Sequence, residues 1–185
     1  DMTSIVSDII VNTDTETGSK MIEELNNTES ESDLSLKIIS DISEKDTAKL
    51  NRLSENNKEQ IEKLTETAIK NADASEENAQ LIAKVVDKTS DEIANKVIKE
   101  VTKNSKDNKE ALSAKVLKSI VSINPDKIEN LSNENKDILI QQTINAAKNQ
   151  NETKDDESND LADVIADIIV NANAVTSGEL LQELD

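Results

Sequence analysis

Five amino-acid types are missing from this 185-residue chain: cysteine, histidine, tryptophan, tyrosine and phenylalanine. Without cysteine or histidine the chain cannot form tetrahedral zinc sites, iron–sulfur clusters, or the Cys–His and Ser–His pairs of nucleophilic enzymes. Without aromatic rings it has no platform for stacking bases, and its formal net charge of −18 repels a phosphate backbone. We therefore expect no nucleic-acid partner.

Glycine and long apolar runs are also scarce. The two glycines leave no phosphate-cradling loop, and no serine lies in the context of a nucleophile elbow. With 39 acidic residues, carboxylate pairs arise by chance, whereas acid–base catalysis requires a pocket that separates their pKa values. We expect no enzyme activity, no catalytic residue and no cofactor. The best apolar stretch, 164–170, is interrupted by Asp167 and is far shorter than the roughly 18 residues of a membrane span, so we expect no membrane insertion.

Internal repetition is the strongest signal in the chain. Residues 34–73 align without a gap with residues 112–151, at an offset of 78, and 13 of the 40 paired positions are identical. Repetition at a fixed offset indicates stacked structural units, each of which buries its apolar face against the next. The offset predicts units of about 80 residues.

A second repeat joins the two ends of the chain. Residues 1–25 align with residues 160–184 at an offset of 159, and both contain the sequence Asp-Ile-Ile-Val-Asn. A third copy is expected between them, because Thr89–Ile93 is similar to Thr176–Leu180. The predicted organisation is a first helical pair at 1–33, repeat unit one at 34–111, the start of repeat unit two at 112–159 with a polar linker at 149–159, and a terminal helical pair at 160–185.

The apolar residues have helical periodicity. Ile61, Leu64 and Ala68 are spaced by three and four residues, as on one face of a helix, and no segment alternates as a half-buried strand does. We predict an all-α tandem helical-repeat solenoid of about twelve short helices, in which neighbouring units stabilise one another. The predicted spans are 3–12, 18–26, 32–43, 46–54, 56–71, 76–88, 90–103, 107–122, 125–131, 134–149, 158–171 and 177–184.

Polar residues mark several helix starts. Thr89 and Thr176 are each followed three residues later by a glutamate, the pattern of a capping box. Ser75 stands before a periodic stretch and is a further predicted N-cap.

One loop has ligand types suited to calcium. Asn12, Asp14 and Glu16 alternate, and Glu23 follows eleven residues after Asn12, a spacing similar to an EF-hand loop. The glycine falls at the seventh position instead of the sixth, and the second copy does not keep the ligand set. The favoured interpretation is a turn whose polar residues cap the next helix, with a weak calcium site as the alternative. Divalent cations are otherwise expected only as loose partners.

Repetition without an evident site, together with high acidity, is typical of a structural protein. We expect a non-catalytic module of a larger acidic protein, extracellular or at the cell surface, that serves as a stalk, sheath or filament component. High negative charge keeps such a chain soluble. Because its two ends are similar, each is expected to present a surface that a neighbour covers, which favours head-to-tail association with copies of itself or with neighbouring repeats.

Two alternatives stay open at this point. A solenoid adaptor would hold a protein partner, and it predicts an exposed patch that the repeat does not require. The sequence has no such excess and lacks the aromatic anchors common in binding hot spots. The weaker alternative is a calcium-responsive assembly module in which the ion bridges acidic faces.

Overall fold

The computed structural model describes residues 2–27, 32–70, 72–104, 109–150, 158–172 and 174–184. These residues form twelve helices and no strand, so the prediction of an all-helical chain of about twelve helices is confirmed. The helices are α1 (Met2–Asn12), α2 (Thr15–Asn27), α3 (Ser32–Lys45), α4 (Thr47–Asn56), α5 (Lys58–Lys70), α6 (Glu76–Lys88), α7 (Asp91–Thr102), α8 (Lys109–Ile123), α9 (Asp126–Glu129), α10 (Asn133–Gln150), α11 (Ser158–Asn171) and α12 (Ala174–Leu184).

The predicted helix boundaries differ most from the observed ones at α2 and α12, each of which begins three residues earlier than expected. At α2 the reason is local, because Asp14 precedes the helix and its Oδ1 accepts the Thr17 backbone N–H at 2.9 Å. This bond satisfies a donor of the first turn that has no partner within the helix. Gly18 then lies inside the first turns of α2, where a Cβ would meet Leu53 Cδ2 of α4 at 3.2 Å.

The two capping-box predictions are wrong. The hydroxyl of Thr89 donates to Val85 O at the end of α6, 2.6 Å away, and Ser90 caps α7 in its place. Thr176 lies inside α12. Thr89–Ile93 and Thr176–Leu180 therefore do not occupy equivalent positions, and that correspondence is also wrong. The predicted cap at Ser75 is confirmed, since its Oγ accepts the Asn78 N–H at 3.2 Å.

The predicted division of the chain falls inside helices at three places. The boundaries at 33/34, 111/112 and 159/160 lie near the starts of α3, α8 and α11. Of the predicted linker at 149–159, residues 151–157 lie outside the part of the chain that the structure describes. The four predicted segments stay predictions.

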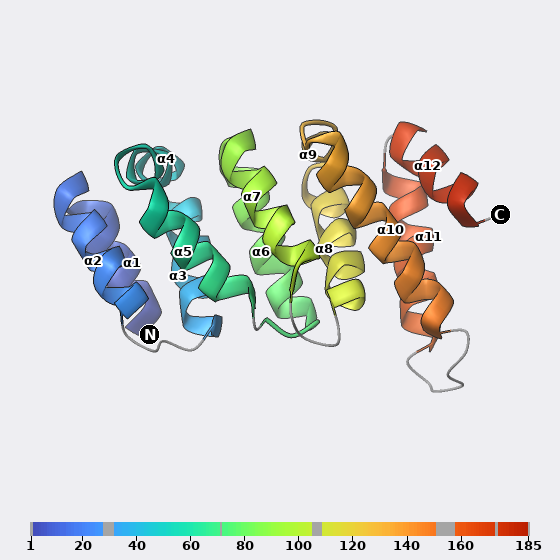
Figure 1. Ribbon diagram of the computed structural model, residues 1–185, viewed down its shortest axis with the longest axis horizontal. Coiled ribbons are helices and arrows are strands. Elements are labelled where there is room, and N and C mark those ends of the chain that lie inside the picture. Colours follow the sequence, from blue (N-terminus) through green and yellow to red (C-terminus); the bar gives the residue numbers. More distant parts are fainter. Residues whose placement is uncertain are drawn as a thin grey trace.

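The helices form two layers that run the length of the molecule (Figure 1). One layer holds α1, α3, α6, α8 and α11, and the other holds α2, α5, α7, α10 and α12. Within each layer, helices that follow one another in this order are in contact. The short helices α4 and α9 lie along one edge, where they connect the first layer to the second. The N-terminus and the C-terminus lie at opposite ends of the row.

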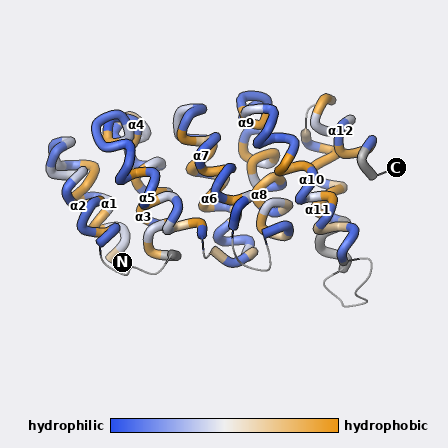
Figure 2. Tube along the Cα trace, in the orientation of Figure 1, coloured by the Kyte–Doolittle hydropathy of each residue, from blue (hydrophilic) through white to orange (hydrophobic). Residues whose placement is uncertain are grey.

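Slim aliphatic side chains fill the space between the layers. The core consists of isoleucine, leucine, valine and alanine, and hydropathy varies along each helix as in amphipathic helices (Figure 2). In α6, Ala79, Ile82, Val85 and Val86 are all buried, because α3 and α8 cover the helix from both sides. Short helices such as these are stabilised mainly by this packing.

Several hydroxyl groups in the core hydrogen-bond within their own helices, and that of Ser113 in α8 donates to Gln142 Oε1 of α10 at 2.6 Å. Ser7 donates to Thr3 O at 2.9 Å, and Thr65 donates to Ile61 O at 2.8 Å. A buried hydroxyl without such a partner would destabilise the fold. These side chains are therefore structural.

Candidate functional site

The predicted calcium residues surround the turn between α1 and α2. Asn12 ends α1, and its Nδ2 donates to Asp8 O at 2.8 Å. Asp14 is engaged through both carboxylate oxygens, since Oδ1 accepts the Thr17 N–H at 2.9 Å and Oδ2 accepts the Thr17 hydroxyl at 2.7 Å. This arrangement is that of a helix N-cap.

The other two predicted ligands lie on the surface of α2. Glu16 Oε1 pairs with Lys20 Nζ at 2.8 Å, and Glu23 is exposed further along the helix. Both residues line a groove that Asn56 and Asn57 border on the other side. Among the described residues, no group of three or more acidic side chains is arranged to hold a metal ion. The calcium site stays a prediction, and the bonds that the structure contains are those of capping and surface pairing.

The cap at Asp14 leads to a pH-dependent prediction. The backbone N–H and the hydroxyl of Thr17 lower the pKa of the Asp14 carboxyl below its ordinary value. A depressed folded-state pKa contributes stability above the unfolded-state pKa, and this stability is lost as the pH falls through the folded-state pKa. We expect Asp14→Asn to be less stable than the parent at neutral pH and equally stable at strongly acidic pH. Urea unfolding followed by circular dichroism across this range measures the difference.

The matched control for Asp14→Asn is Glu23→Gln. It removes an exposed carboxylate from the same helix at a position that caps nothing. A stability difference between Asp14→Asn and the parent that persisted unchanged into acid would contradict a charged cap.

A groove of about 260 Å³ lies between α5 and α7, two helices of the second layer. Buried Ile61 and Ile93 line it, together with Lys96. Lys96 Nζ pairs with Glu62 of α5 and, at 3.2 Å, with Glu92 of its own helix. Lys58 of α5 also pairs with Glu92, at 2.9 Å, and hydrogen bonds from these lysines lower the pKa of the Glu92 carboxyl. These charges join α5 to α7, as expected of structural ion pairs.

The end of the row that carries α1 and α2 exposes apolar side chains, which we name the N-terminal face. Its exposed members on α1 are Met2 (69%), Ile5 (53%) and Ile9 (44%), whose spacing places them on one stripe of the helix. Beside this stripe, Val6, Met21 and Leu25 line a shallow hollow with Thr17, Lys20 and Glu24. α1 packs against α3 and α2 packs against α4 and α5, so the far side of this pair is left uncovered.

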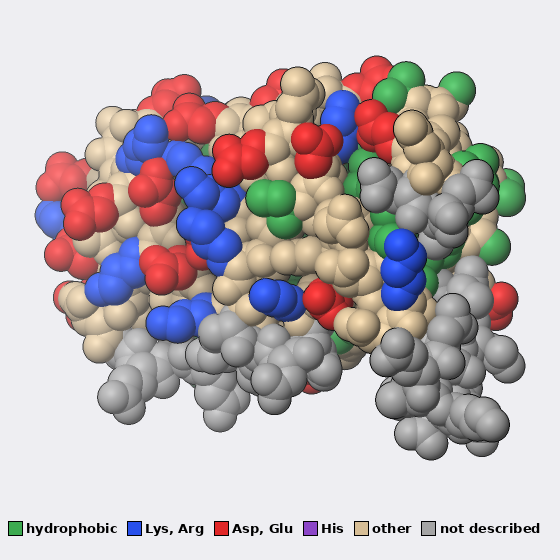
Figure 3. Space-filling model, turned by 45° about the vertical axis from the view of Figure 1, so that its right-hand side comes forward, with side chains coloured by type: hydrophobic (Ala, Val, Ile, Leu, Met, Phe, Trp, Pro, Cys, Tyr) green, Lys and Arg blue, Asp and Glu red, His purple; other side chains and the backbone are tan. Residues whose placement is uncertain are grey.

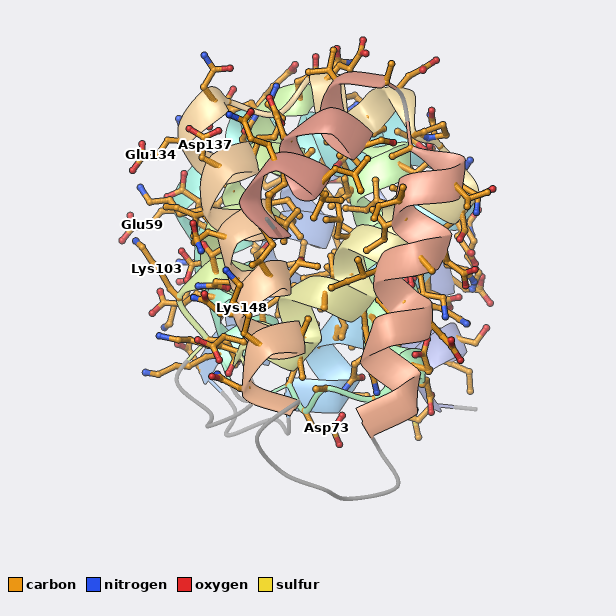
Figure 4. All side chains as sticks on the ribbon, turned by 90° about the vertical axis from the view of Figure 1, so that its right-hand side faces the viewer. Glu59, Asp73, Lys103, Glu134, Asp137 and Lys148 are labelled. Atoms are coloured by element: carbon orange, nitrogen blue, oxygen red, sulfur yellow. The ribbon has the colours of Figure 1, made fainter. Side chains whose placement is uncertain are left out.

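The opposite end also exposes apolar side chains, which we name the C-terminal face. Its members are Val170 (79%) of α11 with Val175 (57%) and Leu181 (51%) of α12. Hydrophobic side chains gather at this end of the molecule (Figure 3). In the view onto it, the labelled Glu59, Glu134 and Asp137 point outward along one side (Figure 4). Charge therefore lies along the side of the row, and apolar surface lies at its end.

The sequence shows no excess of apolar residues because the exposed ones belong to the same periodic stripes as the core. Ile5 and Ile9 continue the helical spacing of α1 in the way that core residues do. What identifies the exposed apolar residues of the two faces is their position in the chain, because they lie in the first and last copies of a repeated element.

No protein-family model, no curated protein and no solved structure matches the chain. Within the described ranges, none of the helices combines the length and the apolar character that crossing a membrane requires.

Proposed function

We propose that the chain is a length of helical solenoid that serves as a non-catalytic structural module of a larger acidic protein. It would be a component of a stalk, sheath or filament at the cell surface or outside the cell. Its partners would be copies of itself or neighbouring repeats. The support comes from contacts between helices that recur along the chain.

The order of the helices supports a repeat. The 78-residue offset relates α3, α4 and α5 to α8, α9 and α10. Helix pairs alternate with these triplets, namely α1–α2, α6–α7 and α11–α12. The contacts alternate in the same way, because α1 meets α3 as α6 meets α8, and α3 meets α6 as α8 meets α11. Contact with adjacent units alone is the property that defines a solenoid.

The observation that carries the proposal is a lysine contact that occurs twice. Lys49 Nζ of α4 donates to Thr13 O, and Lys127 Nζ of α9 donates to Thr89 O at 2.9 Å. The two lysines are 78 residues apart. Each acceptor, Thr13 or Thr89, is the residue that follows the first helix of a pair. The same junction between a pair and the next triplet is therefore built by the same kind of bond in both units.

The side-chain bonds of the described residues are of the kinds that hold helices together. The buried hydroxyls of Ser7, Thr65 and Thr143 donate to carbonyl groups of their own helices, and ion pairs cross the groove between α5 and α7. A net charge of −18 on each chain helps to keep a long assembly soluble. Rigid helices stacked in a row set a fixed distance between the two ends, which is what a spacer requires.

Small-angle X-ray scattering tests this proposal. Extrapolated to infinite dilution, the scattering is expected to be that of an elongated, rigid particle, with the same radius of gyration in chelator and in calcium. A compact or flexible particle would contradict the structural module. A radius of gyration that changed on adding calcium would favour the calcium-responsive alternative over the proposed one.

A further inference from the structure

The motif Asp-Ile-Ile-Val-Asn occurs in α1 and in α11, yet its two isoleucines exchange environments. Ile9 is 44% exposed and Ile10 is fully buried, whereas Ile168 is fully buried and Ile169 is partly exposed. The sequence around them is the same, so the difference comes from the neighbours. α1 packs against the helix that follows it in its layer, α3, and α11 packs against the helix that precedes it, α8.

Other positions related by the 159-residue offset exchange environments in the same direction. Ile5 is 53% exposed and its counterpart Val164 is fully buried. Ile22 is 1% exposed and its counterpart Leu181 is 51% exposed. The N-terminal face thus exposes the positions that the last helix pair buries against preceding helices. On the C-terminal face, Leu181 occupies the position that the first pair buries as Ile22, and Val170 the position of the partly buried Val11.

The middle pair shows what happens when both neighbours are present. Counted back from the end of its helix, Val85 of α6 corresponds to Ile9, and Val86 corresponds to Ile10. Both valines are buried, at 2% and 0% exposure, because α3 and α8 cover α6 from opposite sides. A helix pair within the row therefore buries both stripes, and each end of the chain leaves one of them open.

From this exchange we infer that copies of the chain associate head to tail, with the C-terminal face of one copy covering the N-terminal face of the next. This inference rests on the proposed function and names its partner, a second copy of the chain. Such a contact continues both layers of helices across the junction, with α11 meeting α1 and α12 meeting α2 of the next copy. The apolar stripes at the two faces are then buried, in a contact between two helix pairs where the chain itself has contacts between a pair and a triplet.

Two different faces meet in this contact, so the association does not close on itself. Each added copy presents a new C-terminal face, which produces an open series of sizes. Contact between two N-terminal faces would instead pair stripes that both point toward a preceding unit, which reverses the direction of the row at the junction. The copies repel one another through their net charge, and added salt screens that repulsion. Association is therefore expected to strengthen with salt.

Cysteine cross-linking tests the contact directly, because the chain has no cysteine of its own. Under mild oxidation, the double variant Ile9→Cys with Val170→Cys is expected to form a ladder of disulfide-linked multimers. Mixing the two single variants is expected to give the mixed dimer in preference to either like dimer. The matched control is Ile123→Cys with Val170→Cys, because Ile123 is 43% exposed, as Ile9 is, but ends α8 in the interior of the row.

The molar mass from light scattering provides a second readout without cysteines. In chelator, the mass is expected to rise above the 20.3 kDa of one chain as protein concentration increases, and to rise further in salt. Leu181→Glu places a charge on the C-terminal face at a side chain that is exposed in the single chain. It is expected to weaken association about tenfold or more with an unchanged helical circular dichroism spectrum.

Three results would overturn head-to-tail association: cross-linking of the Ile9–Val170 pair no greater than that of the control pair, preferential formation of like dimers, or an unchanging mass of a single chain at all concentrations. Each of these leaves the elongated, rigid scattering particle intact, so the structural module proposal would stand. Compact or flexible scattering at infinite dilution would instead remove the basis of both.

Discussion

Ile168→Ala is expected to lower the free energy of unfolding by about 2–5 kcal/mol, and Ile9→Ala to lower it by less than about 1 kcal/mol. The two isoleucines occupy the same place in the same five-residue motif. Ile168 is fully buried in the core, so alanine leaves a cavity, whereas Ile9 is 44% exposed, so alanine removes less buried surface and leaves no enclosed cavity. Urea unfolding at low protein concentration, followed by circular dichroism because the chain has no fluorescent aromatic residue, measures both values.

The neighbouring isoleucines provide a control in which the order of the two costs is reversed, with the larger loss of stability in α1. Ile10→Ala is expected to be strongly destabilising, because Ile10 is fully buried, and Ile169→Ala is expected to cost less, because Ile169 is only partly buried. Four variants of one motif thus test whether position in the row decides the cost. Equal costs for Ile9→Ala and Ile168→Ala would contradict the different packing of α1 and α11.

The second large effect is expected at the repeated lysine contact. Lys49 is 3% exposed, and its ammonium group donates to Thr13 O. Lys49→Met keeps most of the apolar stem and removes the donor, which leaves the partly buried Thr13 carbonyl without this partner. Such a loss costs about 1–3 kcal/mol. The free energy of unfolding is again measured by urea titration.

Lys127→Met tests the second copy of that contact, and its expected cost is smaller because the Lys127 side chain keeps 15% of its exposure. Lys20→Met is the control, since Lys20 and Glu16 form an exposed pair on α2 and such pairs contribute little. If Lys49→Met and Lys127→Met were both as stable as the parent, the repeated junction would lose its energetic support.

The aliphatic composition suits an interface built from whole helix faces. Aromatic side chains dominate the centres of most protein interfaces, and this chain has none. Its exposed apolar residues are instead distributed along helices at the two ends of the row. An end contact of this kind would resemble the packing between units within the chain, which also uses only isoleucine, leucine, valine and alanine.

Local sequence determined the number and type of the elements in this protein. Apolar spacing of three and four residues is a property of each segment alone, and it predicted α6 and α11 residue for residue. Capping was less predictable, because several hydroxyl and carboxylate residues compete near each helix end. At α7, Thr89 uses its hydroxyl on the preceding helix and Ser90 becomes the cap. At α2, Asp14 binds the Thr17 N–H and moves the helix start.

The candidate calcium site shows the same limit. Asn12, Asp14, Glu16 and Glu23 have suitable chemistry and nearly suitable spacing, but spacing does not specify what else each side chain can bond. Asp14 is used by Thr17, and Glu16 is paired with Lys20. These partners lie within four residues, so they are visible in the sequence, but their choice among alternatives is made by the helix geometry.

Burial was decided by the tertiary structure. Asp-Ile-Ile-Val-Asn is written identically at the two ends of the chain, and periodicity assigns both isoleucines to an apolar stripe. Which of them meets the core depends on whether a helix packs before or after the pair, and that neighbour lies tens of residues away. The hydrophobic effect acts on surface removed from water, whichever residue carries it. The sequence by itself therefore determined twelve amphipathic helices and their repetition, and only their packing decided which apolar faces are left open at the ends.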